Sequence, residues 1–183
     1  LMILDLGLPD IDGMVVLRNL RTWSSMPVVI VSARGQERAK VEALDAGADD
    51  YLTKPFGTGE LLARIRVAFR HRNARGRSAV PEQSIYEVSG LRVDLEARIV
   101  TVDGNEVHLT PTEFRLVALL IQNAGKILTH KFLLSEVWGP GSADRTQYLR
   151  VFMANLRRKI ERDPADPRYL LTEVGVGYRL RDE

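Results

Sequence analysis

The sequence predicts an α/β domain with a partial, doubly wound parallel sheet, followed by a smaller α+β domain. Residues 1–73 alternate short apolar strands with amphipathic helices, which is the pattern of βαβ units. Residues 85–183 instead begin with short strands, continue with three helices and end in a hairpin. Residues 74–84, "ARGRSAVPEQS", have the composition of a linker. The sequence therefore predicts two domains joined by this linker.

The composition excludes several classes of protein. The chain has no cysteine, so disulfides, thiol chemistry and cysteine-ligated zinc are excluded, and a reducing cytoplasm fits. No apolar run approaches the roughly 18 residues of a membrane span, which predicts no membrane partner. The net charge is only +2, but arginines cluster in residues 64–77 and 145–162. Such clusters indicate contact with a polyanion at specific places.

The first half opens on a strand, residues 1–4, that has no polar face. Strands of this kind are typically covered on both sides in a parallel sheet. Gly47 is expected to cap a helix at its C-terminal end. The further elements expected, in order, are a helix from Asp12–Gly13, a strand over 27–32, a helix over 36–47, a strand over 50–53 and a helix over 58–72.

The three strands of this half end in side chains with complementary chemistry: Asp5, Ser32 and Lys54. Open parallel sheets bind ligands outside the carboxyl ends of their strands, so the three side chains are expected at one rim. There Asp5 would accept a phosphoryl group, Lys54 would pair with its oxygens and Ser32 would donate to one of them. Taken singly, each is more often a turn residue or a solvated charge, and only their combination favours phosphoryl chemistry.

The second half has the element order of a winged helix. Thr110 and Glu113 flank Pro111 in the pattern of a capping box, which begins a helix. The elements expected in order are short strands within 85–109, a helix to about residue 123, a helix over 130–137, a loop over 138–144, a helix over 145–162 and a hairpin that turns at 175–177.

The helix over 145–162 has an apolar side and a basic side when its residues are placed at 100° intervals. The basic side suits the major groove of DNA, because Arg can reach guanine, Gln can pair with adenine and small apolar side chains can touch the thymine methyl group. A solvated basic helix is the alternative, and the neighbouring helices and hairpin favour DNA. The predicted DNA-contacting residues of this helix are Gln147, Arg150, Val151, Ala154, Arg157 and Arg158.

Several segments carry a family resemblance. The segments "DLGLPDIDG", "VIVSAR", "GADDYLTKPF" and "ELLARIRVAFRHR" resemble the second half of the flavodoxin-like receiver domain of two-component response regulators. The downstream half resembles the winged-helix DNA-binding effector domain of the OmpR/PhoB family, and most resembles members that respond to potassium. The resemblance implies a phosphorylation-gated transcriptional regulator of potassium-transport genes, which is not an enzyme.

The resemblance implies roles for the residues at the strand ends. Asp5 would be the phosphoacceptor, Ser32 and Tyr51 the switch residues, and Lys54 the phosphoryl-binding lysine with a cis peptide bond to Pro55. It also implies a Mg²⁺ ion that Asp5 helps to bind. The other acidic ligands follow a first receiver strand, whereas this sequence begins at the counterpart of the third strand. We therefore expect the sequence to lack the N-terminal part of the receiver and to be part of a longer protein.

The resemblance further implies partners and the surfaces that meet them. These are a sensor histidine kinase, promoter DNA with tandem half-sites, RNA polymerase at the loop 138–144, and a second copy of the chain on activation. Tyr178 and Arg179 would bring the hairpin wing to the minor groove. The residues of the implied dimer interface are Lys40, Asp49, Asp50, Glu60 and Arg64, with ion pairs between protomers expected from Lys40 to Glu60 and from Asp49 or Asp50 to Arg64.

Two other functions stay open. A phosphate-independent, dimeric winged-helix protein would share every DNA-facing residue. A phosphatase of the haloacid-dehalogenase type would also place Asp5 after an apolar strand, with Ser32 and Lys54 downstream. Such an enzyme needs a second Asp two residues on, where this sequence has Gly7.

Overall fold

The computed structural model describes residues 1–69, 84–142 and 144–182 of the chain. Contacts divide the chain into two compact units, Leu1–Gly76 with Thr110–Thr112 and Arg77–Leu109 with Glu113–Glu183. The predicted linker, 74–84, lies outside the described residues apart from Ser84, so its bounds stay a prediction. Within the described ranges, no helix combines the length and the apolar character needed to cross a membrane.

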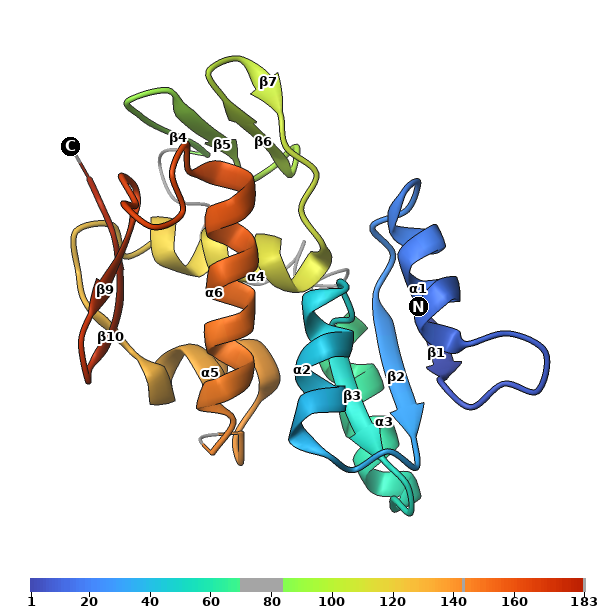
Figure 1. Ribbon diagram of the computed structural model, residues 1–183. Helices are drawn as coiled ribbons and strands as arrows, with labels where there is room; N and C mark the ends of the chain where they lie inside the picture. The colour runs from blue at the N-terminus through green and yellow to red at the C-terminus, as the bar shows by residue number, and fades with distance from the viewer. Residues whose placement is uncertain (70–83, 143, 183) are drawn as a thin grey trace. The chain divides into compact units, whose positions relative to one another are not determined.

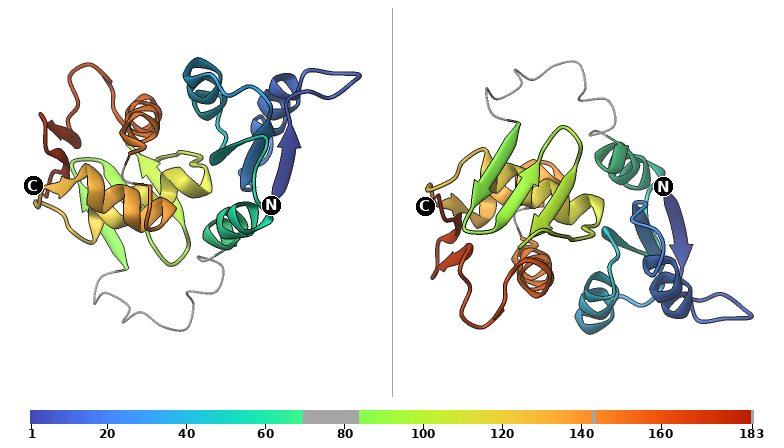
Figure 2. Two further views of the ribbon diagram at one scale, coloured as in Figure 1. Left: turned by 90° about the horizontal axis from the view of Figure 1, so that it is seen from below. Right: turned by 90° about the horizontal axis from the view of Figure 1, so that it is seen from above.

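The first unit is built on a three-stranded parallel sheet (Figure 1). Its strands β1 (Met2–Asp5), β2 (Val28–Ser32) and β3 (Asp50–Thr53) lie in that order. Helices α1 (Gly13–Arg21) and α2 (Glu37–Asp45) cover one face and α3 (Thr58–Phe69) covers the other (Figure 2). All five residues of the central strand β2 are buried, which explains why its sequence is apolar apart from Ser32 at its end. The predicted α/β class with a doubly wound parallel sheet is confirmed.

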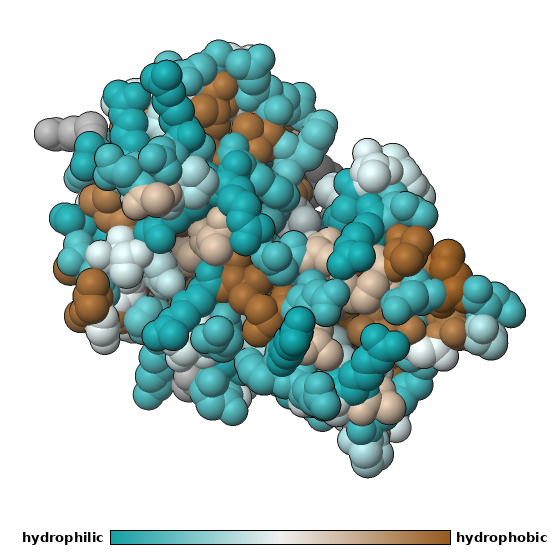
Figure 3. Space-filling model, viewed as in Figure 1, coloured by the Kyte–Doolittle hydropathy of each residue, from teal (hydrophilic) through white to brown (hydrophobic). Residues whose placement is uncertain are grey.

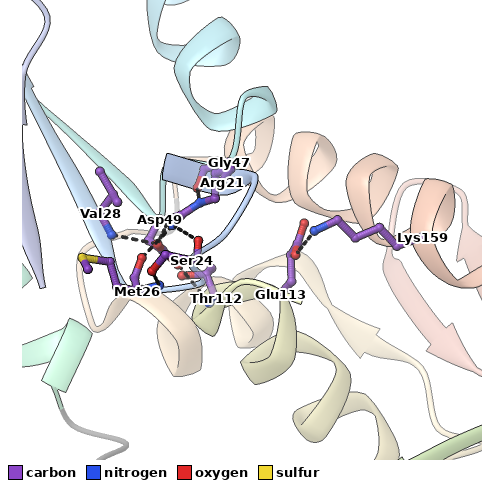
Figure 4. A network of polar contacts seen from close by, with 9 residues as sticks. All are labelled: Arg21, Ser24, Met26, Val28, Gly47, Asp49, Thr112, Glu113 and Lys159. Carbon is purple, nitrogen blue, oxygen red and sulfur yellow. Dashed lines mark hydrogen bonds and ion pairs between the residues drawn. The ribbon is translucent and has the colours of Figure 1, made fainter. Parts of the chain in front are cut away.

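A buried polar network holds the loops that lead into β2 and β3 (Figure 4). Its centre is the guanidinium of Arg21, at the end of α1, which donates to three backbone carbonyls and to the carboxylate of Asp49 at 3.0 Å. Asp49 also accepts a hydrogen bond from the backbone N–H of Val28 at 2.9 Å. The carbonyls belong to Gly47 (2.8 Å), Ser24 (3.1 Å) and Met26 (2.8 Å).

Apolar side chains also reach the surface of the first unit. Apolar atoms gather beside α1 and the loop that precedes it (Figure 3). The residues there are Leu8, Ile11 and Val15, which are 38%, 45% and 42% exposed.

The second unit is a winged helix, as predicted, and the short strands expected before it form a four-stranded antiparallel sheet. The sheet contains β4 (Ile85–Val88), β5 (Leu91–Asp94), β6 (Ile99–Val102) and β7 (Asn105–Glu106) in sequence order. The helices are α4 (Pro111–Ile121), α5 (His130–Trp138) and α6 (Thr146–Ile160), and the wing is the hairpin of β9 (Leu170–Glu173) and β10 (Gly177–Leu180). The two-residue strand β8 (Leu128–Thr129) pairs with β10, and its shortness hid it in the sequence.

The helix α6 buries its apolar side in the second unit. Phe152 is 1% exposed, and its ring lies 5.2 Å from that of Trp138 on α5. Near the other end of α6, Lys159 donates to the buried carboxylate of Glu113 on α4 at 2.6 Å (Figure 4). The apolar face and this ion pair fix α6 against α4 and α5, so the remaining face of α6 is turned away from the core.

Candidate functional site

Asp5, at the end of β1, and Lys54, just after β3, meet at the carboxyl edge of the parallel sheet. Lys54 Nζ donates to Asp5 Oδ2, and the backbone N–H of Gly7 donates to Oδ1 at 2.9 Å. The hydrogen bonds from Lys54 and from Gly7 lower the pKa of Asp5 below its usual value. The Asp5 side chain is 34% exposed. The carboxylate is therefore ionised at neutral pH and accessible from solvent.

The predicted switch residues Ser32 and Tyr51 both hold the backbone of Arg34, which follows β2. Ser32 Oγ accepts from the N–H of Arg34 at 3.1 Å, and the Tyr51 hydroxyl donates to its carbonyl at 2.7 Å. The carbonyl of Ser32 in turn accepts from the N–H of Lys54 at 2.8 Å. Both Ser32 and Tyr51 are 2% exposed. The structure thus links Ser32, Tyr51 and Lys54 through backbone contacts that side-chain patterns in a sequence do not reveal.

Gly13 lies beside Asp5, whereas the sequence pattern indicated it only as the start of a helix. A Cβ atom at this position would lie 2.4 Å from the carbonyl oxygen of Asp5 and 2.7 Å from the Cα of Leu6. The preceding residue, Asp12, caps α1 by accepting from the N–H of Met14 at 2.8 Å. Gly13 therefore lets α1 begin directly against the end of β1, beside Asp5.

The Lys54–Pro55 peptide bond is cis, as the resemblance implied.

The residues that the structure describes do not make a complete magnesium site. No group of three acidic or histidine side chains among them could hold a metal ion. Asp5 supplies one carboxylate, and both of its oxygens already accept hydrogen bonds. Mg²⁺ requires a near-octahedral set of oxygen ligands, so Asp5 alone does not fit it.

The ion pairs that the structure forms at the expected dimer interface lie within one chain. Arg64 on α3 donates to Asp50 at 2.5 Å and to Glu60 at 2.9 Å. Asp49 is paired with Arg21. Because β3 and α3 place Asp50 and Arg64 side by side, this pair forms within one chain. The ion pairs expected between protomers stay a prediction.

Four of the eight residues predicted to contact DNA are exposed or half-buried on the outer face of α6. Gln147, Arg150 and Arg158 are exposed, and Ala154 is half-buried. Arg158 also donates to Asn155 at 2.8 Å. This face presents two arginines and an amide, which are the donors and acceptors that base edges and phosphates can meet.

Two of the predicted DNA-contacting residues are buried, which corrects their expected exposure. Val151 is 8% and Tyr178 is 5% exposed. Val151 adjoins Phe152 and widens the apolar side of α6, while the Tyr178 ring packs edge-on against His130 at 5.5 Å. Burial raises the pKa of the Tyr178 hydroxyl. The apolar arc of α6 is thus wider than the placement at 100° intervals indicated.

The remaining predicted contacts, Arg157 and Arg179, are engaged in contacts with the wing. Arg157 donates to the carbonyl of Leu170 and to the hydroxyl of Thr172. Arg179 on β10 forms an ion pair with Glu173 on β9 at 2.9 Å. Sequence periodicity placed Arg157 on the side of α6 predicted to face DNA, but it could not show that Arg157 contacts β9.

Comparison with known families covers both units. The family described as "Response regulator receiver domain" matches residues 1–66. The family described as "Transcriptional regulatory protein, C terminal" matches residues 104–180.

The chain is also similar to individual proteins over nearly its whole length. It is 54% identical over 180 residues to the KDP operon transcriptional regulatory protein KdpE of Escherichia coli. This match covers 98% of this chain and 78% of that protein. It is 53% identical over 178 residues to the transcriptional regulatory protein KdpE of Mycobacterium tuberculosis, over 97% of this chain and 77% of that protein.

Among solved structures, a mutant of the protein RitR matches with a TM-score of 0.73 and 27% identity, over 100% of this chain and 79% of that chain. The matches cover the parallel sheet with Asp5 and Lys54 at its edge as well as the winged helix. The chain therefore belongs to the OmpR/PhoB-type family of two-component response regulators, which are DNA-binding transcriptional regulators.

Proposed function

We propose that the chain controls potassium-transport genes by binding their promoters, and that phosphorylation of Asp5 gates this binding. The observation that carries the proposal is the contact between Lys54 and the ionised, accessible carboxylate of Asp5. The identity of 53–54% to two KdpE proteins supports potassium-transport genes as the targets. A regulator that acts on promoters would work in the cytoplasm.

The chemical step would be transfer of a phosphoryl group from a phosphohistidine of a sensor histidine kinase. A carboxylate oxygen of Asp5 attacks phosphorus, an O–P bond forms, and the N–P bond breaks. The imidazole nitrogen keeps the bond's electron pair and takes up a proton. The lowered pKa of Asp5 keeps the nucleophile ionised, and the Lys54 ammonium pairs with the added negative charge.

Phosphorylation of Asp5 would change the conformation of the receiver through the hydrogen bonds that Ser32 and Tyr51 make to Arg34. Ser32 Oγ now accepts from the Arg34 N–H and would turn to donate to the phosphoryl group. Tyr51 holds the carbonyl of the same residue, so movement of Arg34 would reach Tyr51. Receiver domains normally bind Mg²⁺ for this reaction, and Asp5 would supply one carboxylate ligand to it.

Activation would join two chains through α2, β3 and α3. Two winged helices would then bind tandem half-sites, and tethering raises affinity without new base contacts. The loop 138–144 after α5 would contact RNA polymerase. The residues of this interface would be Lys40, Asp49, Asp50, Glu60 and Arg64, and those that contact DNA would include Gln147, Arg150, Ala154, Arg158 and Arg179.

A phosphorylation assay on the full-length protein, where the receiver is expected to have its other Mg²⁺ ligands, tests the gate. The protein would be incubated with acetyl phosphate and Mg²⁺, and its mass would be measured. Its affinity would then be measured for a duplex that it selects from a random-sequence pool. Uptake of one phosphoryl group and tighter DNA binding are expected, and Asp5→Asn should abolish both. Asp10→Asn is the matched control, since Asp10 is an exposed carboxyl on the following loop, and it should behave as wild type.

The result would also separate the alternatives. If the affinity for the selected duplex is the same with and without the phosphoryl group, phosphorylation does not gate DNA binding. The chain would then be the phosphate-independent regulator. Uptake that persists in Asp5→Asn would place the phosphoryl group elsewhere.

A further inference from the structure

Arg157 of α6 and Glu161, the residue that caps the C-terminal end of this helix, hold both backbone polar groups of Leu170, the first residue of β9. The guanidinium of Arg157 donates to the Leu170 carbonyl from Nε at 3.0 Å and from Nη2 at 2.6 Å. The carboxylate of Glu161, one turn further along at the end of the helix, accepts from the Leu170 N–H at 2.7 Å. The two side chains therefore clamp the first residue of the wing to the helix.

The clamp extends to both strands of the wing. Arg157 Nη2 also donates to the Thr172 hydroxyl on β9 at 2.7 Å, and the Arg157 guanidinium carbon lies 6.0 Å from the centre of the Tyr178 ring on β10. Glu161, which is 8% exposed, accepts two further backbone N–H groups, from Arg168 at 2.7 Å and Tyr169 at 2.9 Å.

The sheet of the wing is small, so the clamp adds to the packing of its buried residues Leu170, Tyr178 and Leu180. Its strands β9 and β10 have four residues each, and β8 adds only two. A hairpin of this size is marginal in water without packing against another element. β9 is also an edge strand in the order β8-β10-β9. Charge-assisted hydrogen bonds from Arg157 and Glu161 are the stronger kind, so they can set the position of β9 relative to α6.

We propose that Arg157 and Glu161 are positioning residues that fix the wing relative to α6, so that helix and wing reach the DNA in register. The inference rests on the proposed contact of this face with DNA. It assigns Arg157 a different role from Arg150, which is exposed on the outer face of the same helix. Arg150 would contact DNA directly, whereas Arg157 would act through the wing.

The two roles differ in their response to charge and to salt. A phosphate contact needs only a positive charge, so Arg157→Lys would preserve it, whereas lysine lacks the planar fork that holds Leu170 and Thr172 together. Loss of a phosphate contact also lowers the slope of log affinity against log salt by about 0.9 for duplex DNA. Loss of a positioning residue leaves that slope unchanged.

The test is the dissociation constant of the whole chain for a duplex selected by wild type, measured at several salt concentrations. Arg157→Lys and Arg157→Ala are each expected to raise it roughly tenfold with the salt slope of wild type, a loss equal to about one charge-assisted hydrogen bond. Thr172→Val, which removes one contact at an exposed site, should give a smaller loss of the same kind. Faster amide exchange at Leu170 and Thr172 should accompany the loss in all three variants.

Arg150→Ala is the matched control for direct contact, and it should weaken binding with a reduced salt slope. Wild-type affinity in Arg157→Lys, or a reduced slope in Arg157→Ala, would overturn the positioning role and make Arg157 a direct contact. If neither wild type nor Arg150→Ala shows sequence-selective binding, the proposed DNA-contacting face itself is wrong. Arg157→Ala would then still be expected to loosen the wing amides.

Discussion

Arg21 and Asp49 form an ion pair at 3.0 Å in which the two side chains are only 12% and 6% exposed. Arg21 ends α1, and Asp49 precedes β3. The pair therefore joins two connections that follow different helices of the first unit. Because the Asp49 carboxylate is buried, the stability of the fold depends on its pairing with Arg21. Removing one member of a buried ion pair leaves the charge of the other uncompensated.

Arg21→Ala should destabilise the first unit by about 3–5 kcal/mol, because Asp49 would stay buried without its guanidinium partner and three carbonyls would lose their donor. The free energy of opening can be measured by hydrogen exchange at the amides of β2, which report on this unit alone. Arg18→Ala is the control, since the Arg18–Glu42 pair is long, at 3.4 Å, with side chains 57% and 58% exposed. It should cost no more than about 0.5 kcal/mol, and equal effects of the two changes would contradict the prediction.

Gly13→Ala should destabilise the first unit by about 1–3 kcal/mol, because the new Cβ would collide with the backbone of Asp5 and Leu6 at the end of β1. Chemical shifts of the Asp5 amide should change as well. Gly59→Ala is the matched control on α3, where an added Cβ meets nothing within 4 Å. It should stabilise α3 by about 0.5–1 kcal/mol. A neutral Gly13→Ala would mean that α1 can move away from β1 freely.

The sequence predicted the order and type of the elements because hydrophobic periodicity and turn residues are local signals. The apolar run before Ser32 became the central strand β2, and the capping pattern at residues 110–113 opens α4. The two-residue strand β8 carries no such signal, because its pairing with β10 depends on residues about fifty positions away.

Side-chain roles were harder to predict wherever a residue binds the backbone of a distant segment. Arg157 lies on the predicted face of α6, yet its guanidinium is held by Leu170. Tyr178 was expected to be exposed in the wing and is buried beside His130. In each case the sequence shows which face of an element a residue occupies, but not which other element covers that face.

Stability of the second unit should fall as pH rises from about 10 to about 12, in part through Tyr86. Burial, and to a lesser extent Asp182, raises the pKa of Tyr86 from 10.0 to about 12. The folded state therefore keeps this proton more tightly than the unfolded state. Its contribution is complete below pH 10 and is lost as pH rises through the folded pKa.

Tyr86→Phe removes both this pH dependence and the hydrogen bond that the Tyr86 hydroxyl donates to the carbonyl of Arg181. At neutral pH the change should cost about 1 kcal/mol. Urea denaturation at pH 8 and pH 11 would show the variant losing less stability than wild type between the two. Ultraviolet titration should show one tyrosine fewer ionising at high pH, and an unchanged titration would contradict the assignment.

Lys54→Ala should raise the pKa of Asp5 back toward its ordinary value of 3.8, because Lys54 is the largest cause of the lowered pKa. Since the folded pKa is lowered, the pair stabilises the fold above the ordinary pKa, and this contribution is lost as pH falls through the folded value. The variant should therefore lose less stability on acidification than wild type. Carbon-13 NMR titration of the Asp5 carboxyl measures the pKa directly, with Lys40→Ala on α2 as the control that leaves it in place. An Asp5 pKa that stays low without Lys54 would assign the effect to the Gly7 N–H, and the ionised carboxylate would then not depend on the lysine that is proposed to receive the phosphoryl oxygens.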